Sequence, residues 1–370
     1  LYSYLFQVAA NAVPTADAGG PYNILEGEHT LVLDASASAD PDIGQSLIYT
    51  WTVAGVEFAP NVSATLPLTW PELQAIGIDD GLATFDVSVL VDDGHGGTST
   101  ASTILTLGNV APTAVFGNGG TVTEGSAGGV DFAGQFDPSA QDTSAGFRYS
   151  YDFDNDGILE IVASTFPSAV VPAEYLADGP GARTVAGRIQ DKDGGVSNYT
   201  TLIQIQNAPP VADAQGPYSA AENTPITLTG SATDAGTLDT LTFEWDLDYD
   251  GATFSADMTG QNVSYTWTDD YSGHVALRVT DKDGASHVDV APVTISNIAP
   301  VADAGDDQTV SEGDLVQFTA TATDQSPDDG ATLNCTWDFG DPHDSTPGTG
   351  ATASHVFADN GTYTVTVTVT

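Results

Sequence analysis

The chain has 370 residues, of which 51 are acidic and 6 are basic, so its formal net charge is −45. A surface with this charge excludes binding to nucleic acid or to an anionic membrane, because both need Lys and Arg to neutralise phosphate. The single cysteine, Cys335, excludes an internal disulfide framework, and no apolar run in the sequence reaches the roughly 18–20 residues that span a bilayer.

Four short linkers, in which a proline closely follows an asparagine, divide the chain. Their prolines Pro14, Pro112, Pro210 and Pro300 lie 112 − 14 = 98, 210 − 112 = 98 and 300 − 210 = 90 residues apart. Such a period predicts a tandem array, and each unit has the roughly 100-residue size of an immunoglobulin-like sandwich. We therefore predict an all-β chain of four sandwiches, named repeat 1 (residues 13–109), repeat 2 (110–207), repeat 3 (208–297) and repeat 4 (298–370).

Residues 1–12 precede the first repeat. Tyr4, Phe6 and Val8 alternate with other residues as in a strand, and the segment leads directly into the first linker. It lacks the basic start and the continuous apolar run of a signal peptide, so we do not expect one. We interpret residues 1–12 as the closing strand of a preceding or neighbouring repeat.

The same elements recur inside each repeat. A glutamate follows the first extended segment, then come a strand, an Asp-rich loop that includes Asp137 and Asp142 in repeat 2, and a strand with alternating inward residues. The third inward residue is aromatic and is the expected core anchor of each sandwich: Trp51, Tyr151, Trp245 and Trp337. Repeat 1 also carries an insertion, residues 71–79, which we expect to form a short helical turn.

Repeat 4 ends on Gly361–Thr370, a strand of period two, without the closing strand seen in repeats 2 and 3. Two explanations remain open. The sequence is a window of a longer repeat protein, or the first strand of one copy completes the last repeat of another copy by strand addition. An unclosed edge of alternating Thr and Val is in either case a template for pairing.

Repeat 4 resembles the PKD domain, the repeat named after polycystic kidney disease, through its string Trp337-Asp338-Phe339-Gly340-Asp341. Repeats 2 and 3 carry variants of this string, and repeat 1 departs furthest because Thr52 follows its tryptophan. The resemblance covers nearly the whole chain. It implies an immunoglobulin-like sandwich that serves binding, spacing or adhesion outside the cell, sometimes with calcium, and that carries no chemistry of its own.

Two acidic loops have the spacing of calcium ligands. Oxygen ligands at every second residue, followed by a glycine, suit the coordination of Ca²⁺. The first loop offers Asp152, Asp154, Asp156 and the closing acid Glu160, and the second offers Asp246, Asp248 and Asp250 without a closing acid. The alternative is a hairpin in which the aspartates cap their own turn.

A second set of candidate calcium ligands surrounds the linkers. We predict that each junction combines a linker asparagine with the early glutamate and the acidic turn of one and the same repeat, as in the calcium-stiffened junctions of cadherin-like arrays. These residues are Asn109, Asn207 and Asn297 in the linkers, Glu26, Glu124 and Glu222 early in the repeats, and Asp92, Asp93, Asp191, Asp193, Asp281 and Asp283 in the turns. Simple turn geometry is the alternative.

Catalysis finds little support in the sequence, since its six histidines form no zinc motif and no nucleophile elbow or phosphate-binding loop is present. We therefore predict an extracellular, cell-surface structural or adhesive protein: a calcium-stiffened segment of a fibre, sheath, S-layer or giant adhesin. Its expected partners are copies of itself or adjoining repeats, and a surface polysaccharide is a further candidate. The alternative is a spacer or binding region of a secreted hydrolase.

Overall fold

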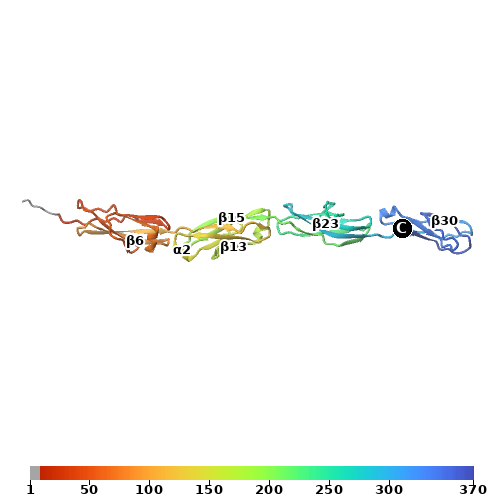
Figure 1. The fold of residues 1–370 in the computed structure, drawn as a ribbon, viewed down its shortest axis with the longest axis horizontal. Coiled ribbons are helices and arrows are strands. Elements are labelled where there is room, and N and C mark those ends of the chain that lie inside the picture. The colour runs from red at the N-terminus through yellow and green to blue at the C-terminus, as the bar shows by residue number, and fades with distance from the viewer. Residues whose placement is uncertain (1–8) are drawn as a thin grey trace, which may run out of the picture. The chain divides into compact units, whose positions relative to one another are not determined.

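The computed structural model describes residues 9–370, so the strand predicted for residues 1–12 falls mostly outside the described residues (Figure 1). Contacts between residues group the chain into two units. Unit 1 comprises Leu1–Leu176 and Pro180–Gln206, and unit 2 comprises Ala177–Gly179 and Asn207–Thr370. Unit 1 contains most of repeats 1 and 2, and unit 2 contains repeats 3 and 4.

Repeat 1 is a two-layer β structure. Its five-stranded sheet has the order β1-β7-β6-β3-β4, and the pair β2-β5 forms the second layer over a shared core. The predicted helical turn in the insertion is confirmed as α1. The elements are β1 (Tyr22–Leu25), β2 (Thr30–Asp34), β3 (Ile48–Val53), β4 (Val56–Glu57), β5 (Thr65–Thr69), α1 (Trp70–Ala75), β6 (Ala83–Asp92) and β7 (Thr98–Gly108).

Repeat 2 repeats this plan with the sheet orders β12-β11-β14-β15-β9 and β13-β10-β8. Its core is richer in aromatic rings, and residue 187, which pairs with Tyr151, is a glycine because a Cβ there would lie 2.7 Å from the Phe116 ring. The elements are β8 (Thr113–Asn118), β9 (Val122–Thr123), β10 (Gly128–Phe136), α2 (Ala140–Ala145), β11 (Arg148–Asp152), β12 (Ile161–Ser164), β13 (Ser168–Val171), the 3₁₀ helix η1 (Ala173–Leu176), β14 (Gly181–Gln190) and β15 (Val196–Gln206).

Repeat 3, in unit 2, has the five-stranded order β17-β24-β23-β20-β21 and the pairs β16-β19 and β18-β22. In repeats 1 to 3 the first strand of the large sheet runs parallel to the last one, and the last two strands form a long antiparallel hairpin. The elements of repeat 3 are β16 (Val211–Asp213), β17 (Tyr218–Ala221), β18 (Ile226–Thr229), β19 (Ser231–Thr233), β20 (Thr242–Asp246), β21 (Met258–Thr259), β22 (Asn262–Tyr265), β23 (Tyr271–Thr280) and β24 (Ser286–Ser296).

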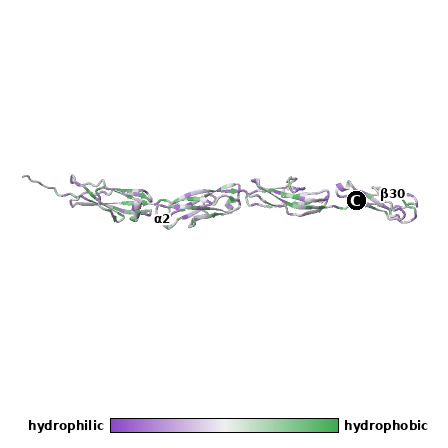
Figure 2. Ribbon diagram, in the orientation of Figure 1, coloured by the Kyte–Doolittle hydropathy of each residue, from purple (hydrophilic) through white to green (hydrophobic). Residues whose placement is uncertain are grey.

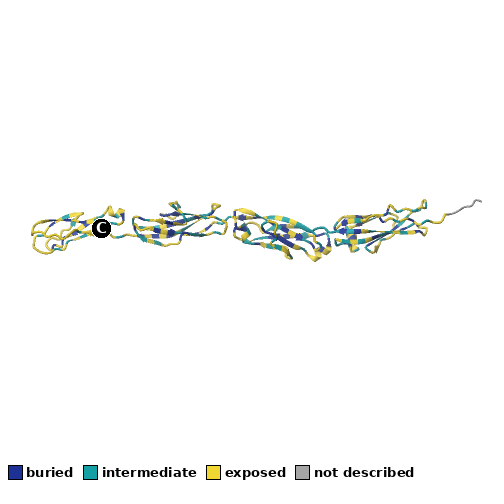
Figure 3. Ribbon diagram, turned by 180° about the vertical axis from the view of Figure 1, so that it is seen from behind, coloured by how far each residue is buried: buried dark blue, intermediate teal, exposed yellow. Residues whose placement is uncertain are grey.

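Repeat 4 has a smaller sheet, β29-β28-β31, with the pairs β25-β27 and β26-β30. Its core has fewer buried residues than the others, as Figure 3 shows. The elements are β25 (Val301–Asp303), β26 (Leu315–Thr319), β27 (Thr321–Thr323), α3 (Pro327–Gly330), β28 (Cys335–Asp338), β29 (Gly348–Thr349), β30 (Thr352–Val356) and β31 (Thr366–Val369).

The sequence prediction of an all-β, immunoglobulin-like array is confirmed, including its core anchors. Trp51, Tyr151, Trp245 and Trp337 are at most 3% exposed, and each lies in a separate apolar cluster. Apolar and polar residues alternate along the strands because one face packs on the core and the other meets water (Figure 2). No helix within residues 9–370 is long and apolar enough to cross a membrane.

Two of the Asp-rich segments that were predicted to be loops each contain a helical turn. Ser139 accepts a hydrogen bond from the backbone N–H of Asp142 at 3.2 Å, and Ser326 accepts one from Asp329 at 3.3 Å. A serine three residues before an acid is an N-cap signal, so these turns, α2 and α3, were readable from the sequence. Each turn places its aspartate beside a linker.

Candidate metal centre

Glu26 fastens the end of repeat 1 to the linker that follows it. Its carboxylate accepts hydrogen bonds from the backbone N–H of Gly81 at 2.5 Å and of Val110 at 3.0 Å, and the residue is only 3% exposed. A Cβ on Gly81 would lie 2.7 Å from both Glu26 Oε1 and the Cα of Asn109. The glycine is therefore needed for the chain to approach this buried carboxylate.

Asn109 fastens the same linker to the next repeat. Its Nδ2 donates to Asp191 Oδ2 at 3.0 Å, while Asp191 Oδ1 accepts from the N–H groups of Asp193 at 2.9 Å and Gly195 at 2.8 Å. In unit 2, Asn207 donates to Asp281 at 3.0 Å. The hydrogen bond from a linker asparagine to the first aspartate of an Asp-Lys-Asp-Gly turn therefore occurs in both units.

The predicted grouping within one repeat is wrong. Asp93 bonds to Asn11, in the linker before repeat 1, at 2.8 Å, whereas Glu26 bonds to Val110 in the linker after it. The acidic turn and the early glutamate therefore sit at opposite ends of a sandwich, because the parallel pairing of β1 with β7 carries Glu26 to the end where β7 finishes. The junction of repeats 1 and 2 brings Glu26 of the first repeat close to Asp193 in the turn of the second.

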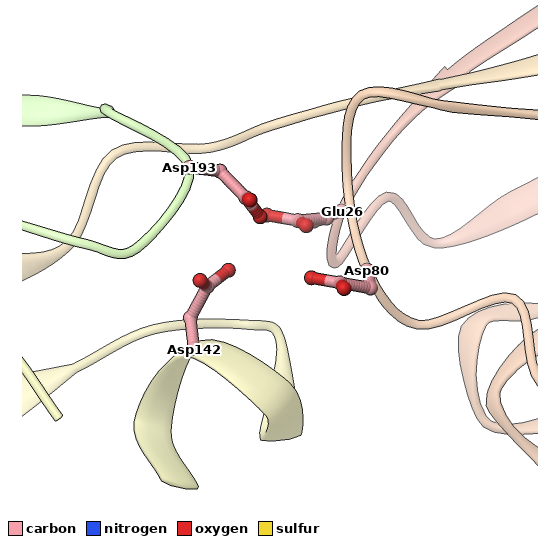
Figure 4. Close-up of side chains that lie close together, drawn as sticks. All are labelled: Glu26, Asp80, Asp142 and Asp193. Atoms are coloured by element: carbon pink, nitrogen blue, oxygen red, sulfur yellow. The ribbon is translucent and has the colours of Figure 1, made fainter. Parts of the chain in front are cut away.

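Four carboxylates converge at the junction of repeats 1 and 2. Each of Glu26, Asp80, Asp142 and Asp193 contributes an oxygen, and these oxygens lie within 4.8 Å of one another. Figure 4 shows them approaching from four segments, with Asp142 on α2 and Asp193 on the turn between β14 and β15. Glu26 and Asp193 were predicted ligands, but Asp80 and Asp142 were not.

Several oxygens at this junction are buried without a hydrogen-bond donor. They are Oδ1 of Asn109, Oδ2 of Asp137 and Oδ2 of Asp142, a residue that is 0% exposed, whereas Oδ1 of Asp142 lies 3.5 Å from Lys192 Nζ. Burying an oxygen without a partner costs about 1–3 kcal/mol, so native structures seldom leave one. Carboxylate and amide oxygens are the ligands that Ca²⁺ prefers, and the donor set fits that ion.

Unit 2 leaves oxygens unpaired at the corresponding positions. These are Oδ1 of Asn207 and Oδ2 of Asp234, Asp239 and Asp324, together with Oε2 of Glu222. Glu222 is 0% exposed and accepts from the N–H of Ile298 at 2.8 Å, as Glu26 does from Val110. Its carboxylate lies within 4.8 Å of those of Asp324 and Asp329, the latter on α3. The junction of repeats 3 and 4 therefore has a similar acidic centre.

Burial shifts the protonation of these acids. Desolvation raises the pKa of Glu26 to about 7, with the charges of Asp142 and Asp137 adding to the rise against two backbone hydrogen bonds. Desolvation likewise raises the pKa of Asp137 to about 6, and it raises the pKa of Asp142 although Lys192 opposes it. Each raised pKa means that the folded state disfavours the ionised form of that carboxylate.

We expect unit 1, in the presence of a chelator, to lose stability as pH rises from about 4.5 to about 7. The folded pKa of Glu26 lies above its ordinary value of 4.5, so its contribution is complete below pH 4.5 and is lost as pH rises through about 7. The loss should be on the order of 2 kcal/mol. Urea unfolding at several pH values measures it, and Glu26→Gln should flatten this part of the profile. An equal slope in wild type and variant contradicts the assignment.

The predicted loop site in repeat 2 is compact. The carboxylates of Asp152, Asp154, Asp156 and Glu160 each place an oxygen within 4.8 Å of the others. Much of this arrangement is turn capping, since Asp152 Oδ2 accepts from Gly157 N–H at 2.8 Å and Glu160 Oε2 accepts from Phe153 N–H at 2.6 Å. Both readings of the sequence, ion site and self-capped hairpin, are compatible with this geometry.

The loop in repeat 3 has a further acid, Asp257, in the hydrogen-bonding position that Glu160 takes in repeat 2. Asp257 accepts from Leu247 N–H at 2.7 Å, as Glu160 does from Phe153. The prediction missed it because Asp257 lies 11 residues after Asp246, while Glu160 lies 8 after Asp152. Asp246 accepts from Ser255 N–H at 2.7 Å, Asp248 is exposed, and Asp250 accepts from Ala252 and Thr253 N–H at 2.8 and 2.9 Å.

The remaining predicted ligands lie as follows. Glu124 is 1% exposed, and its backbone N–H donates to Gln206 at 2.9 Å, at the end of repeat 2. Asp92 accepts from Gly94 N–H at 2.8 Å, Asp283 donates its own N–H to Asp281 at 2.9 Å, and Asn297 is exposed.

Comparison with solved structures finds other tandem arrays of β domains. A variant of titin domains I67–I69 is 13% identical over 78% of this chain and 100% of its own length, with a TM-score of 0.37. Domains EC22–24 of mouse cadherin-23 are 16% identical over 78% of this chain and 100% of their own, with a TM-score of 0.28. At these TM-scores the likenesses carry no functional argument. No curated protein sequence matches the chain.

The sequence model of the family described as "PKD domain" matches residues 207–295 and 297–370, which correspond to repeats 3 and 4. Repeats 1 and 2 share the sheet order and parallel edge strand of repeat 3. The resemblance carried by the Trp337-Asp338-Phe339 string is thereby confirmed, and repeats 3 and 4 match the PKD domain in tandem.

Proposed function

We propose that this chain is an extracellular structural or adhesive segment in which Ca²⁺ at the acidic junctions restrains neighbouring repeats. The observation that carries the proposal is the recurrence of buried, donor-free oxygens beside the linkers of both units. An ion bound there would satisfy these oxygens and relieve the repulsion among the carboxylates. It would also join Glu26 of repeat 1 to Asp142 and Asp193 of repeat 2.

The acidic composition supports the same function. A net charge of −45 opposes close approach of the repeats unless cations screen or bind it. Bound ions act at short range and at defined positions, whereas dissolved salt screens all carboxylates alike. The effect of Ca²⁺ on the chain should therefore exceed that of an equal ionic strength of NaCl.

We further propose that repeat 4 accepts an added strand, supplied by residues 1–10 of another copy. Repeat 4 has a groove of about 710 Å³ whose lining includes Phe318, Trp337 and Phe357. In repeats 1 to 3 a closing strand buries alternating apolar residues at this place, such as Leu105 and Leu107 on β7. Tyr4, Phe6 and Val8 alternate in the sequence in the same way.

Small-angle scattering over a concentration series tests both parts. In Ca²⁺ the radius of gyration should exceed that in chelator, because junctions restrained by ions bend less, and NaCl or MgCl₂ at equal ionic strength should not reproduce the increase. Glu222→Gln should reduce the increase, while Glu57→Gln, at an exposed position, should leave it unchanged. An equal radius in all media contradicts the calcium proposal. A particle mass that stays constant with concentration contradicts strand addition between copies.

A further inference from the structure

The two lysines of the chain occupy equivalent places. Lys192 and Lys282 each follow the aspartate that fastens a linker asparagine, in the turns Asp191-Lys192-Asp193-Gly194 and Asp281-Lys282-Asp283-Gly284. With only 6 basic residues in 370, a random placement would not put both lysines in this one position. Each ammonium group points into a set of carboxylates.

Lys192 joins repeat 1 to repeat 2. Its Nζ lies 2.7 Å from Asp193 Oδ2 and 3.5 Å from Asp142 Oδ1, and it also forms an ion pair with Asp80. Asp80 belongs to repeat 1, and the other two belong to repeat 2. An ammonium group has three N–H donors and no acceptor, so three surrounding carboxylates match it. Its exposed fraction, 29%, contrasts with the 0% of Asp142.

Lys282 makes the same contacts within unit 2. Its Nζ lies 2.6 Å from Asp283, 2.5 Å from Asp239 and 2.7 Å from Asp178, and the Asp239 side chain is 0% exposed. Hydrogen bonds to these three carboxylates hold the pKa of Lys282 above its usual range, against a smaller effect of desolvation. The lysine therefore carries its charge throughout the neutral pH range.

The turn of repeat 1 has a different residue at this place. Asp93 is the aspartate that bonds to a linker asparagine there, and Gly94 and His95 follow it where the other turns have Lys and Asp. His95 donates its backbone N–H to Asp93 at 2.7 Å, and its ring Nδ1 lies 2.9 Å from the Asp93 carbonyl. The lysine is therefore not required to shape the turn, which points to an electrostatic role.

We infer that Lys192 and Lys282 are built-in cations that hold their carboxylate sets together without a metal, and that each of them fills one cation position within its own set. Asp80, Asp142 and Asp193 then share a covalently attached charge, while the donor-free oxygens of Asn109 and Asp137 and Oδ2 of Asp142 remain for a dissolved ion. The second half of this inference, that the lysine lowers the number of Ca²⁺ ions bound, rests on the proposed function. The first half does not.

Removing the charge tests the inference. In chelator, Lys192→Met should raise the unfolding equilibrium constant of unit 1 roughly 10-fold, because buried carboxylates lose their partner. Lys192→Arg, which keeps the charge, should stay near wild type. Arg188→Met is the matched control, since it makes the same charge change at an exposed residue of β14 whose Nε donates only to Asn198 at 3.3 Å. Urea unfolding that is monitored by hydrogen exchange of the amides in β14 and β15 measures this constant for unit 1.

Calorimetric titration with Ca²⁺ separates the two halves. Lys192→Asp should bind one more ion per chain than wild type and regain in Ca²⁺ the stability that it loses in chelator. If Lys192→Met and Arg188→Met unfold alike in chelator, the lysine is not a structural cation and the inference is overturned. If Lys192→Met is destabilised but no variant or wild type binds Ca²⁺, the lysine role holds and the proposed calcium function fails.

Discussion

Replacing Asp142 by asparagine is expected to stabilise unit 1 in chelator and to abolish its stabilisation by Ca²⁺. Asp142 is 0% exposed, its Oδ2 receives no hydrogen bond, its Oδ1 lies 3.5 Å from Lys192 Nζ, and burial raises its pKa although Lys192 opposes the rise. Removing this charge should stabilise the metal-free fold by about 1 kcal/mol, because Lys192 keeps its closer partner Asp193 at 2.7 Å. The same substitution removes a proposed Ca²⁺ ligand, whose carboxylate lies close to three others.

The calcium half of this prediction has a defined size. A ligand at 100 times its dissociation constant stabilises the state that binds it by about 2.7 kcal/mol, and that increment should vanish in Asp142→Asn. Urea unfolding in Ca²⁺ and in chelator measures both effects. Asp131→Asn is the control, because Asp131 is an exposed acid on β10 of the same repeat. A variant that is less stable than wild type in both media would show that Asp142 is needed for folding and is not an ion ligand.

The sequence predicted those elements that are determined by residues close together along the chain. Alternation around Trp245 predicted its strand, and the recurring glutamates predicted residues that are indeed buried beside the linkers: Glu26, Glu124 and Glu222. The helical turns α2 and α3 were missed although Ser139 and Ser326 lie three residues before an acid. In these cases the information was present within a few residues.

The carboxylate cluster at the junction of repeats 1 and 2 could not be predicted from local sequence patterns, because its residues come from distant parts of the chain. Asp80 and Asp142 lie 62 residues apart and meet only when α2 of repeat 2 approaches the loop before β6 of repeat 1. Among 51 acids, no spacing distinguishes these two. The end of the sandwich at which each acid sits depends on the parallel pairing of β1 with β7, a tertiary fact that local patterning does not contain.

This arrangement has a consequence for tandem proteins. Repeats 1 to 3 each offer a buried glutamate after the first strand of the large sheet and an acidic turn in the last hairpin, so a junction like that of repeats 1 and 2 is complete only when two repeats follow one another. The asparagine of the linker contacts the turn, and the residue after it contacts the glutamate, as Asn109 and Val110 do. Changing the linker length by one residue would break this register, because adjacent residues serve opposite partners.

The largest loss of stability is expected from Trp245→Ala, at about 3–5 kcal/mol. Trp245 is 0% exposed and lies in the core cluster of repeat 3, and its indole N–H donates to Gly260 at 3.1 Å. Single domains are stable by only about 5–15 kcal/mol, so this change should leave repeat 3 close to unfolding. Leu238→Ala, at a residue that is 65% exposed in the same repeat, should change stability by less than about 0.5 kcal/mol.

Hydrogen exchange can resolve where the effect of Trp245→Ala stops. Each repeat has its own apolar cluster, and none of the buried residues around Trp245 belongs to repeat 1 or 2. Amides of β20 and β23 should therefore lose protection, while those of β6 and β7 should keep it. Loss of protection in both would show that the repeats fold as one cooperative body. In that case Ca²⁺ could not control bending at a junction. Bending between two repeats requires that each sandwich stays folded while the linker changes its conformation.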